Sequence, residues 1–191
     1  DWDVNKQMSV EKTKQIVLDN LHNGAIILMH SVSISNARSL PDIIDEVAKS
    51  IQTVYKHKNI DLIINVDEKL NSKIVGDPFR LKQILSNIIG NAYKFTEEGF
   101  IKISGYIAEN DQFYTIRIED TGIGIEKGNQ KLVFEEFAQA NENIEKEYGG
   151  TGLGLSICQK IISILGGDLK LESTFGKGST FEVQLPLQFD N

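Results

Sequence analysis

Apolar residues near the start of the chain recur at three- and four-residue steps, the spacing of an amphipathic helix. This pattern predicts a helix over residues 10–36. A second helix is expected after Ser39, which offers an N-cap, with Pro41 in its first turn. The apolar stripe of this second helix is expected to comprise Ile43, Ile44, Val47, Ala48, Ile51, Val54 and Tyr55.

Strand-like runs and helical stripes then alternate along the rest of the chain. A strand is predicted at Ile60–Val66 and a short extended piece at Lys73–Val75. Asp77 is expected to cap a helix that has Pro78 at its first position and runs to about Phe95. The further predicted elements are strands at Phe100–Ile107 and Phe113–Ile118, a short helix near Phe134, a helix at Leu153–Leu165, and strands at Asp168–Thr174 and Thr180–Leu185.

Helices interspersed among hairpin strands predict an α+β fold, a two-layer sandwich with a mixed, mainly antiparallel sheet and helices on one face. We expect two parts of the chain. Residues 1–38 would form an N-terminal helical segment, and residues 39–191 would form the globular domain.

The composition is that of an ordinary folded protein, with 40% hydrophobic and 25% charged residues. A net charge of −7 argues against a nucleic-acid-binding surface, which needs clustered basic residues. The single cysteine, Cys158, excludes an internal disulfide and a Cys-rich metal site, and its apolar helical surroundings indicate inert packing. No apolar run approaches the roughly 20 residues that span a bilayer, so we expect no direct membrane contact by this chain.

The predicted helix from Asp77 to Phe95 has two different faces. Its core stripe is expected to be Leu81, Ile84, Leu85, Ile88, Ala92 and Phe95. The opposite face carries Arg80, Gln83, Asn87, Asn91 and Lys94. Asparagine is a mediocre helix former, and two of them at i and i+4 aim their amide oxygens at one point. Such oxygens suit Mg²⁺, and a lysine one turn on suits phosphate; an ordinary solvated face is the alternative.

Two glycine-rich segments offer further chemistry. Asp120 follows a predicted strand and precedes Gly122 and Gly124, so its carboxylate could accept a hydrogen bond from an exocyclic amine while the backbone approaches a ring. A plain turn is the alternative here. The segment Gly149–Leu155 opens a helix, where free N–H groups and the helix dipole attract anions. It fits neither a Walker A motif nor a dinucleotide fingerprint.

Phe134 and Phe137 stand three residues apart between the two glycine segments. In the absence of other signals, we expect both side chains to pack into the core. The polar loop that follows, residues 139–148, has the composition of a mobile lid.

In their order along the chain, these segments resemble the N, G1, F and G2 boxes of sensor histidine kinases, within the GHKL ATPases that include gyrase, MutL and the ninety-kilodalton heat-shock chaperones. Residues 176–181 resemble the last box of the same set, and the resemblance covers roughly residues 60–187. It implies a Bergerat α/β sandwich that binds ATP and Mg²⁺ between helices and lid.

The resemblance also implies roles for individual residues. Asp120 would accept from the adenine amine, Asn91 with Asn87 would hold Mg²⁺, and Lys94 would contact the phosphates. The full ATP-binding set implied is Asn87, Asn91, Lys94, Phe95, Asp120, Gly122, Gly124, Ile125, Phe134, Phe137, Gly150, Thr151, Gly152, Leu153, Gly154, Leu155 and Thr180.

The residue at position 87 distinguishes relatives that transfer the phosphoryl group of ATP from those that hydrolyse ATP. In the gyrase-like relatives a Glu that activates water matches Asn87, and an amide cannot act as that general base. The resemblance therefore implies a protein-histidine kinase that transfers the γ-phosphoryl group of ATP to a histidine. A non-catalytic ATP-sensing or scaffold module is the alternative, and a GHKL hydrolase is disfavoured by Asn87.

The family's phosphoacceptor is a His followed by acidic, basic, Thr and Pro positions. None of His22, His30 and His57 has that context. Residues 10–36 resemble the second helix of the dimerisation hairpin, and we expect the first helix, with the acceptor histidine, to lie upstream of Asp1 or to be absent. The implied partners are a histidine-bearing dimerisation domain, a response regulator receiver domain and, in the full-length protein, a second copy. The implied location is the cytoplasm, with or without a membrane tether elsewhere.

Overall fold

The computed structural model describes residues 39–71, 77–108, 112–136 and 152–187. Several predictions fall outside these described residues: the helix over 10–36 within the segment 1–38, the extended piece Lys73–Val75, and the site residues Phe137, Gly150 and Thr151. Within the described residues, no helix is long and apolar enough to cross a membrane.

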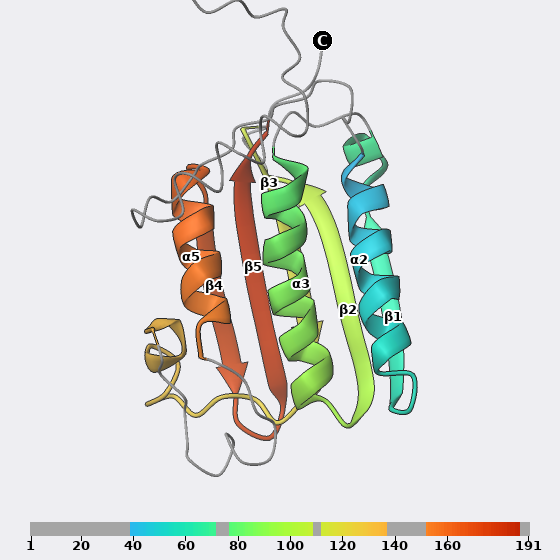
Figure 1. Ribbon diagram of the computed structural model, residues 1–191, viewed down its shortest axis with the longest axis vertical. Coiled ribbons are helices and arrows are strands. Elements are labelled where there is room, and N and C mark those ends of the chain that lie inside the picture. Colours follow the sequence, from blue (N-terminus) through green and yellow to red (C-terminus); the bar gives the residue numbers. More distant parts are fainter. Residues whose placement is uncertain (1–38, 72–76, 109–111, 137–151, 188–191) are drawn as a thin grey trace, which may run out of the picture. The chain divides into compact units, whose positions relative to one another are not determined.

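Among the described residues, five strands form one sheet in the order β1-β2-β3-β5-β4 (Figure 1). The strands are β1 (Asn59–Val66), β2 (Glu98–Ile107), β3 (Phe113–Asp120), β4 (Asp168–Thr174) and β5 (Gly178–Pro186). Of the four pairs that these strands form, β1–β2 is parallel and the other three are antiparallel. This confirms the predicted mixed, mainly antiparallel sheet.

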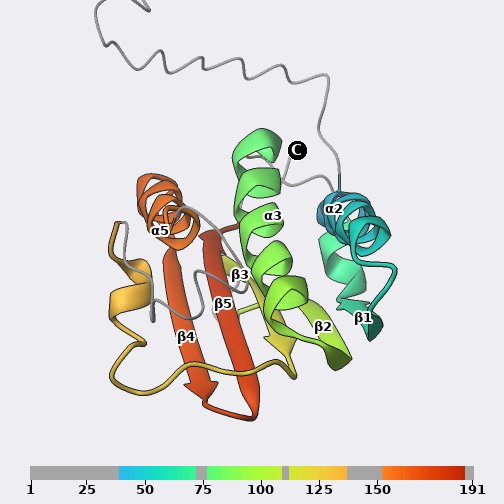
Figure 2. The ribbon, with the colours of Figure 1, turned by 60° about the horizontal axis from the view of Figure 1, so that its bottom comes forward.

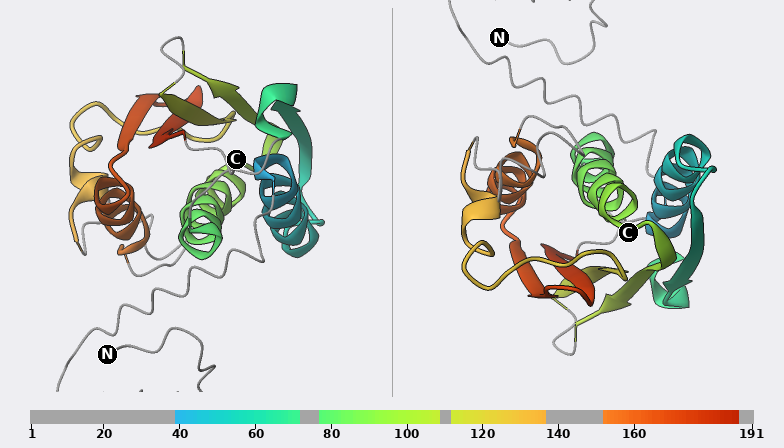
Figure 3. Two further views of the ribbon diagram at one scale, coloured as in Figure 1. Left: turned by 90° about the horizontal axis from the view of Figure 1, so that it is seen from above. Right: turned by 90° about the horizontal axis from the view of Figure 1, so that it is seen from below.

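The three described α-helices lie on one face of this sheet, as Figures 2 and 3 show from two directions. They are α2 (Leu40–Val54), α3 (Pro78–Phe95) and α5 (Gly154–Ile164), and α3 packs between the other two. The predicted two-layer α/β sandwich is confirmed.

Side-chain caps explain where two of these helices begin. The Ser39 hydroxyl accepts from the N–H of Asp42 at 3.4 Å. Asp77 Oδ1 accepts from the N–H groups of Phe79 and Arg80 at 3.0 and 3.1 Å. Proline near the start of each helix strengthens the signal because its fixed φ suits the first turn. Both predicted starts are therefore confirmed.

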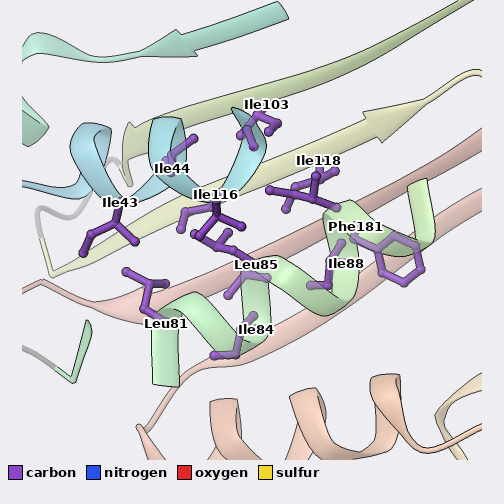
Figure 4. Packing of buried hydrophobic residues seen from close by; sticks show 14 of the residues in the cluster. Ile43, Ile44, Leu81, Ile84, Leu85, Ile88, Ile103, Ile116, Ile118 and Phe181 are labelled. Carbon is purple, nitrogen blue, oxygen red and sulfur yellow. The ribbon is translucent and has the colours of Figure 1, made fainter. Parts of the chain in front are cut away.

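The core lies between the sheet and the helices and consists mainly of isoleucine and leucine (Figure 4). Two predicted core positions are wrong: Val54 is 70% exposed at the end of α2, and Phe95 does not belong to the core. On α3, Ile89 and Tyr93 are buried instead. Because α3 contacts helices on both sides, its buried arc is wider than a single stripe.

Cys158 on α5 is fully buried, as its apolar surroundings predicted. Its thiol donates to the carbonyl of Ile84 at 3.8 Å. Burial raises the pKa of this thiol to about 11. Since the thiolate is the reactive form, Cys158 is an inert packing residue.

Candidate functional site

Asp120, the last residue of β3, presents a buried carboxylate to the helical layer. The residue is 7% exposed. Its Oδ1 accepts from the N–H of Gly122 at 2.9 Å and of Ser179 at 3.3 Å. Burial raises the pKa of Asp120, and these two backbone bonds oppose that shift. Both bonds go to Oδ1, so Oδ2 can accept from a further donor.

The loop after Asp120 packs so closely against its neighbours that it requires glycine. A Cβ on Gly122 would stand 2.4 Å from the carbonyl oxygen of Phe95. Gly124 has a φ of 66°, and a Cβ there would stand 2.1 Å from the Thr174 carbonyl oxygen. The loop is therefore wedged between the end of α3 and the β4–β5 turn.

Backbone and side-chain hydrogen bonds fix this loop from both sides. Ile123 donates its N–H to the Phe95 carbonyl at 3.1 Å, and its own carbonyl accepts from Gly176 at 2.7 Å. The N–H of Ile125 donates to the Ser173 hydroxyl at 2.7 Å. The predicted site residues Phe95, Asp120, Gly122, Gly124 and Ile125 are thus brought together.

Lys58 fixes the end of α3 and was not predicted. Its ammonium donates to the carbonyls of Tyr93, Lys94 and Thr96 at 3.0, 3.1 and 2.9 Å, and pairs with Glu97 at 2.9 Å. A cation at a helix C-terminus also complements the helix dipole. No local pattern identifies Lys58, because these contacts join segments more than thirty residues apart.

The polar face of α3 meets the beginning of α5. Asn87 Oδ1 lies 3.1 Å from where a Cβ of Gly154 would stand, and its side chain hydrogen-bonds the Cys158 thiol. Asn91, one turn further along α3, is half-buried. The ammonium of Lys94 lies 4.8 Å from the Phe95 ring centroid, and burial lowers the pKa of Lys94. The amide face therefore borders the second glycine segment.

The N-terminus of α5 lacks a side-chain cap. Leu153 occupies the N-cap position and makes no capping bond, while Gly152 before it has a φ of 68°. The first N–H groups of a helix have no partner within the helix, and the dipole there favours negative charge. This start can therefore bind an anion such as phosphate.

Phe134 lies in a short 3₁₀ helix (η3, Leu132–Phe134) that contacts α5. Its ring is partly buried and packs against the core, as predicted for this residue. Glu136, just after η3, forms an ion pair with Lys160 of α5. The segment between the glycine loops is thus attached to α5.

Thr180 lies on the face of the sheet away from the helices. In β5 the buried positions alternate, so Ser179 and Phe181 point to the helical layer and Thr180 points to the other side. Thr180 pairs in register with Glu119, whereas Ser179 pairs with Asp120. The structure therefore does not bring Thr180 beside Asp120. Ser179, which was not predicted, occupies that place because β5 begins at Gly178.

The family model for histidine kinase-, DNA gyrase B-, and HSP90-like ATPases matches residues 76–189. The chain therefore belongs to this family.

Similar proteins narrow the class further. The signal transduction histidine-protein kinase BarA of Escherichia coli K12 is 37% identical over 150 residues, which are 77% of this chain and 16% of BarA. Hybrid signal transduction histidine kinase L of Dictyostelium discoideum is 39% identical over 142 residues, 72% of this chain and 8% of that protein. The chain thus spans a small part of these relatives. The predicted resemblance to the ATP-binding domain of sensor histidine kinases is confirmed.

Solved structures of histidine kinases have a similar fold. The catalytic domain of histidine kinase ThkA superposes with a TM-score of 0.66 at 29% identity, over 78% of this chain and 95% of that one. Full-length ShkA in complex with AMPPNP gives a TM-score of 0.73 at 24% identity, over 97% of this chain and 41% of ShkA, which shows a shared fold.

The donors on α3 fit Mg²⁺. Asn87 and Asn91 offer amide oxygens, hard ligands that this ion takes together with phosphate oxygens and water. Among the described residues, no group of three or more His, Cys, Asp or Glu side chains could hold a metal ion.

Proposed function

We propose that this domain binds Mg-ATP and transfers the γ-phosphoryl group to a histidine on a dimerisation domain, as a protein-histidine kinase. The observation that carries this proposal is the amide side chain of Asn87 against Gly154, at the uncapped start of α5. An amide at this place can help to align phosphates but cannot remove a proton from water.

The adenine base is recognised at Asp120. Its carboxylate accepts from the exocyclic amine, while Gly122 and Gly124 let the backbone come close to the ring. Ile125 and Phe95 border this place. Guanine carries a carbonyl instead of that amine, so it would direct an acceptor at the carboxylate. Adenine nucleotides are therefore preferred.

The phosphates lie at the start of α5, over the segment Gly152–Leu155. Asn91 and Asn87 hold Mg²⁺, which neutralises phosphate charge, and the Lys94 ammonium adds a positive charge nearby. Phosphoryl transfer needs mainly alignment and charge neutralisation, so these groups suffice once an acceptor imidazole is presented.

The partners follow from this reaction. A dimerisation domain supplies the acceptor histidine, and a receiver domain takes the phosphoryl group onward. The full-length protein acts as a homodimer. The similarity to BarA and to hybrid histidine kinase L supports this arrangement.

Two measurements test the proposal. Calorimetry with ATP, GTP and the Asp120→Asn variant should show that GTP binds weakly and that the variant loses about 10- to 100-fold in ATP affinity. Radiolabelled ATP, incubated with the domain and a supplied dimerisation domain, should label that domain's histidine. Tight ATP binding without label on any acceptor would favour an ATP-sensing module, and rapid phosphate release would favour a hydrolase.

The pKa of Asp120 gives a pH test. Because burial raises this pKa above its ordinary value of 3.8, the carboxyl group takes up its proton at a higher pH than an exposed aspartate does. The protonated form accepts less well from the adenine amine. ATP affinity should therefore decrease as the pH falls through this raised pKa, and Asp120→Asn should remove that decrease.

A further inference from the structure

Thr96, directly after α3, carries a buried hydroxyl without a partner. The residue is 0% exposed. Among the described residues, its Oγ1 and the Tyr93 hydroxyl are the buried side-chain atoms that make no hydrogen bond. A buried hydroxyl without a partner destabilises a fold, and a methyl group of the same shape would not. The hydroxyl of Thr96 therefore does not serve the stability of the domain.

The backbone around this hydroxyl is fixed. The N–H of Thr96 donates to the Ala92 carbonyl at 3.1 Å. Its own carbonyl accepts from the Lys58 ammonium at 2.9 Å. The backbone of Thr96 is therefore held at the end of α3 from both sides, and its side chain is enclosed.

The hydroxyl lies beside the carboxylate of Asp120. The position of a Cβ on Gly122 is 2.8 Å from Thr96 Oγ1 and 2.9 Å from Asp120 Oδ1, so both oxygens flank the same point. A carboxylate has about four acceptor sites, and Oδ1 has filled two with N–H groups. The Phe95 carbonyl oxygen also lies near this point, at 2.4 Å, but it already accepts from the N–H of Ile123 at 3.1 Å.

We propose that Thr96 is a positioning residue for adenine recognition: its hydroxyl donates to the Asp120 carboxylate when a nucleotide covers that carboxylate. Rotation of the hydroxyl hydrogen and a small shift of the glycine loop make the bond. It offsets the loss of water around the carboxylate and keeps its free oxygen aimed at the amine. This inference rests on the proposed role of Asp120.

The test is a double-mutant cycle on ADP affinity, with Thr96→Val, Asp120→Asn and the pair, and with Thr96→Ser as the matched control. Thr96→Val should weaken ADP binding by about tenfold, and Thr96→Ser should retain most of the affinity. In the Asp120→Asn background the valine should have little further effect, because its partner is changed. Thermal unfolding without nucleotide should show Thr96→Val at least as stable as the parent.

The possible outcomes distinguish the proposed role of Thr96 from the proposed recognition of adenine by Asp120. A structural role would lower stability and affinity together, so a less stable Thr96→Val overturns the inference. Unchanged ADP affinity in Thr96→Val, with loss in Asp120→Asn, overturns the inference and leaves adenine recognition by Asp120 intact. Unchanged affinity in Asp120→Asn overturns the proposed adenine site itself.

Discussion

Helices α3 and α5 lie side by side on the sheet, yet their N-termini differ in chemistry. At α3 the carboxylate of Asp77 occupies the first N–H groups. At α5 the apolar Leu153 stands in the same position and makes no capping bond. A capped start makes a helix stable and leaves little for an anion, whereas an uncapped start is less stable and can bind phosphate. The difference separates a structural helix start from one that we propose to bind phosphate.

A side-chain cap introduced at the start of α5, like the one at the start of α3, should have the largest effect, and the quantity that it changes is ATP affinity. Leu153→Asp would place a carboxylate on the N–H groups that we assign to phosphate. Like charges brought together cost several kcal/mol, so ATP affinity should fall by two or more orders of magnitude. Calorimetry measures this loss. Leu153→Asn, a neutral cap, should weaken binding less, and parental affinity in Leu153→Asp would place the phosphates elsewhere.

Releasing the other end of α3 should have the next largest effect. Lys58→Met keeps most of the side-chain length but leaves three carbonyls without their charged donor. Unfolding free energy should fall by about 2–3 kcal/mol, measured by denaturant titration. Glu97 is exposed, so Glu97→Gln serves as the control with a change below about 0.5 kcal/mol. An equal loss in both variants would attribute the effect to the ion pair alone.

Removing the cap of α3 should have the smallest effect. Asp77→Ala should cost about 1 kcal/mol of stability, with ATP affinity unchanged, because this helix start takes no part in binding. Asp77→Asn, which can still cap, should stay near the parent stability. A clear loss of ATP affinity in Asp77→Ala would show that the two helix starts are not functionally separate.

The elements that local signals define could be predicted from the sequence. Asp77 with Pro78 marked the start of α3, and Ser39 with Pro41 marked the start of α2. The glycines at 122 and 124 also marked a close backbone approach. Such signals lie within a few residues of the feature that they determine.

The features that were missed depend on register and on distant contacts. The predicted strand at Thr180 in fact begins at Gly178, and the alternation of its faces assigns Ser179 rather than Thr180 to Asp120. Lys58 and Thr96 look like ordinary surface residues in sequence. Their roles arise only when the start of β1 and the loop after β3 meet the end of α3.

Strand β1 pairs with β2 from Asn59 opposite Glu98 to Val66 opposite Gly105. The match to the family begins at residue 76, after β1 has ended. A piece cut at that residue would lose α2, β1 and Lys58, and would leave β2 at the margin of the sheet. Its unpaired N–H and C=O groups would then offer a template for other chains, and such exposed edges promote aggregation. We therefore expect that the unit that folds without aggregating begins before residue 76, where the match to the family model starts.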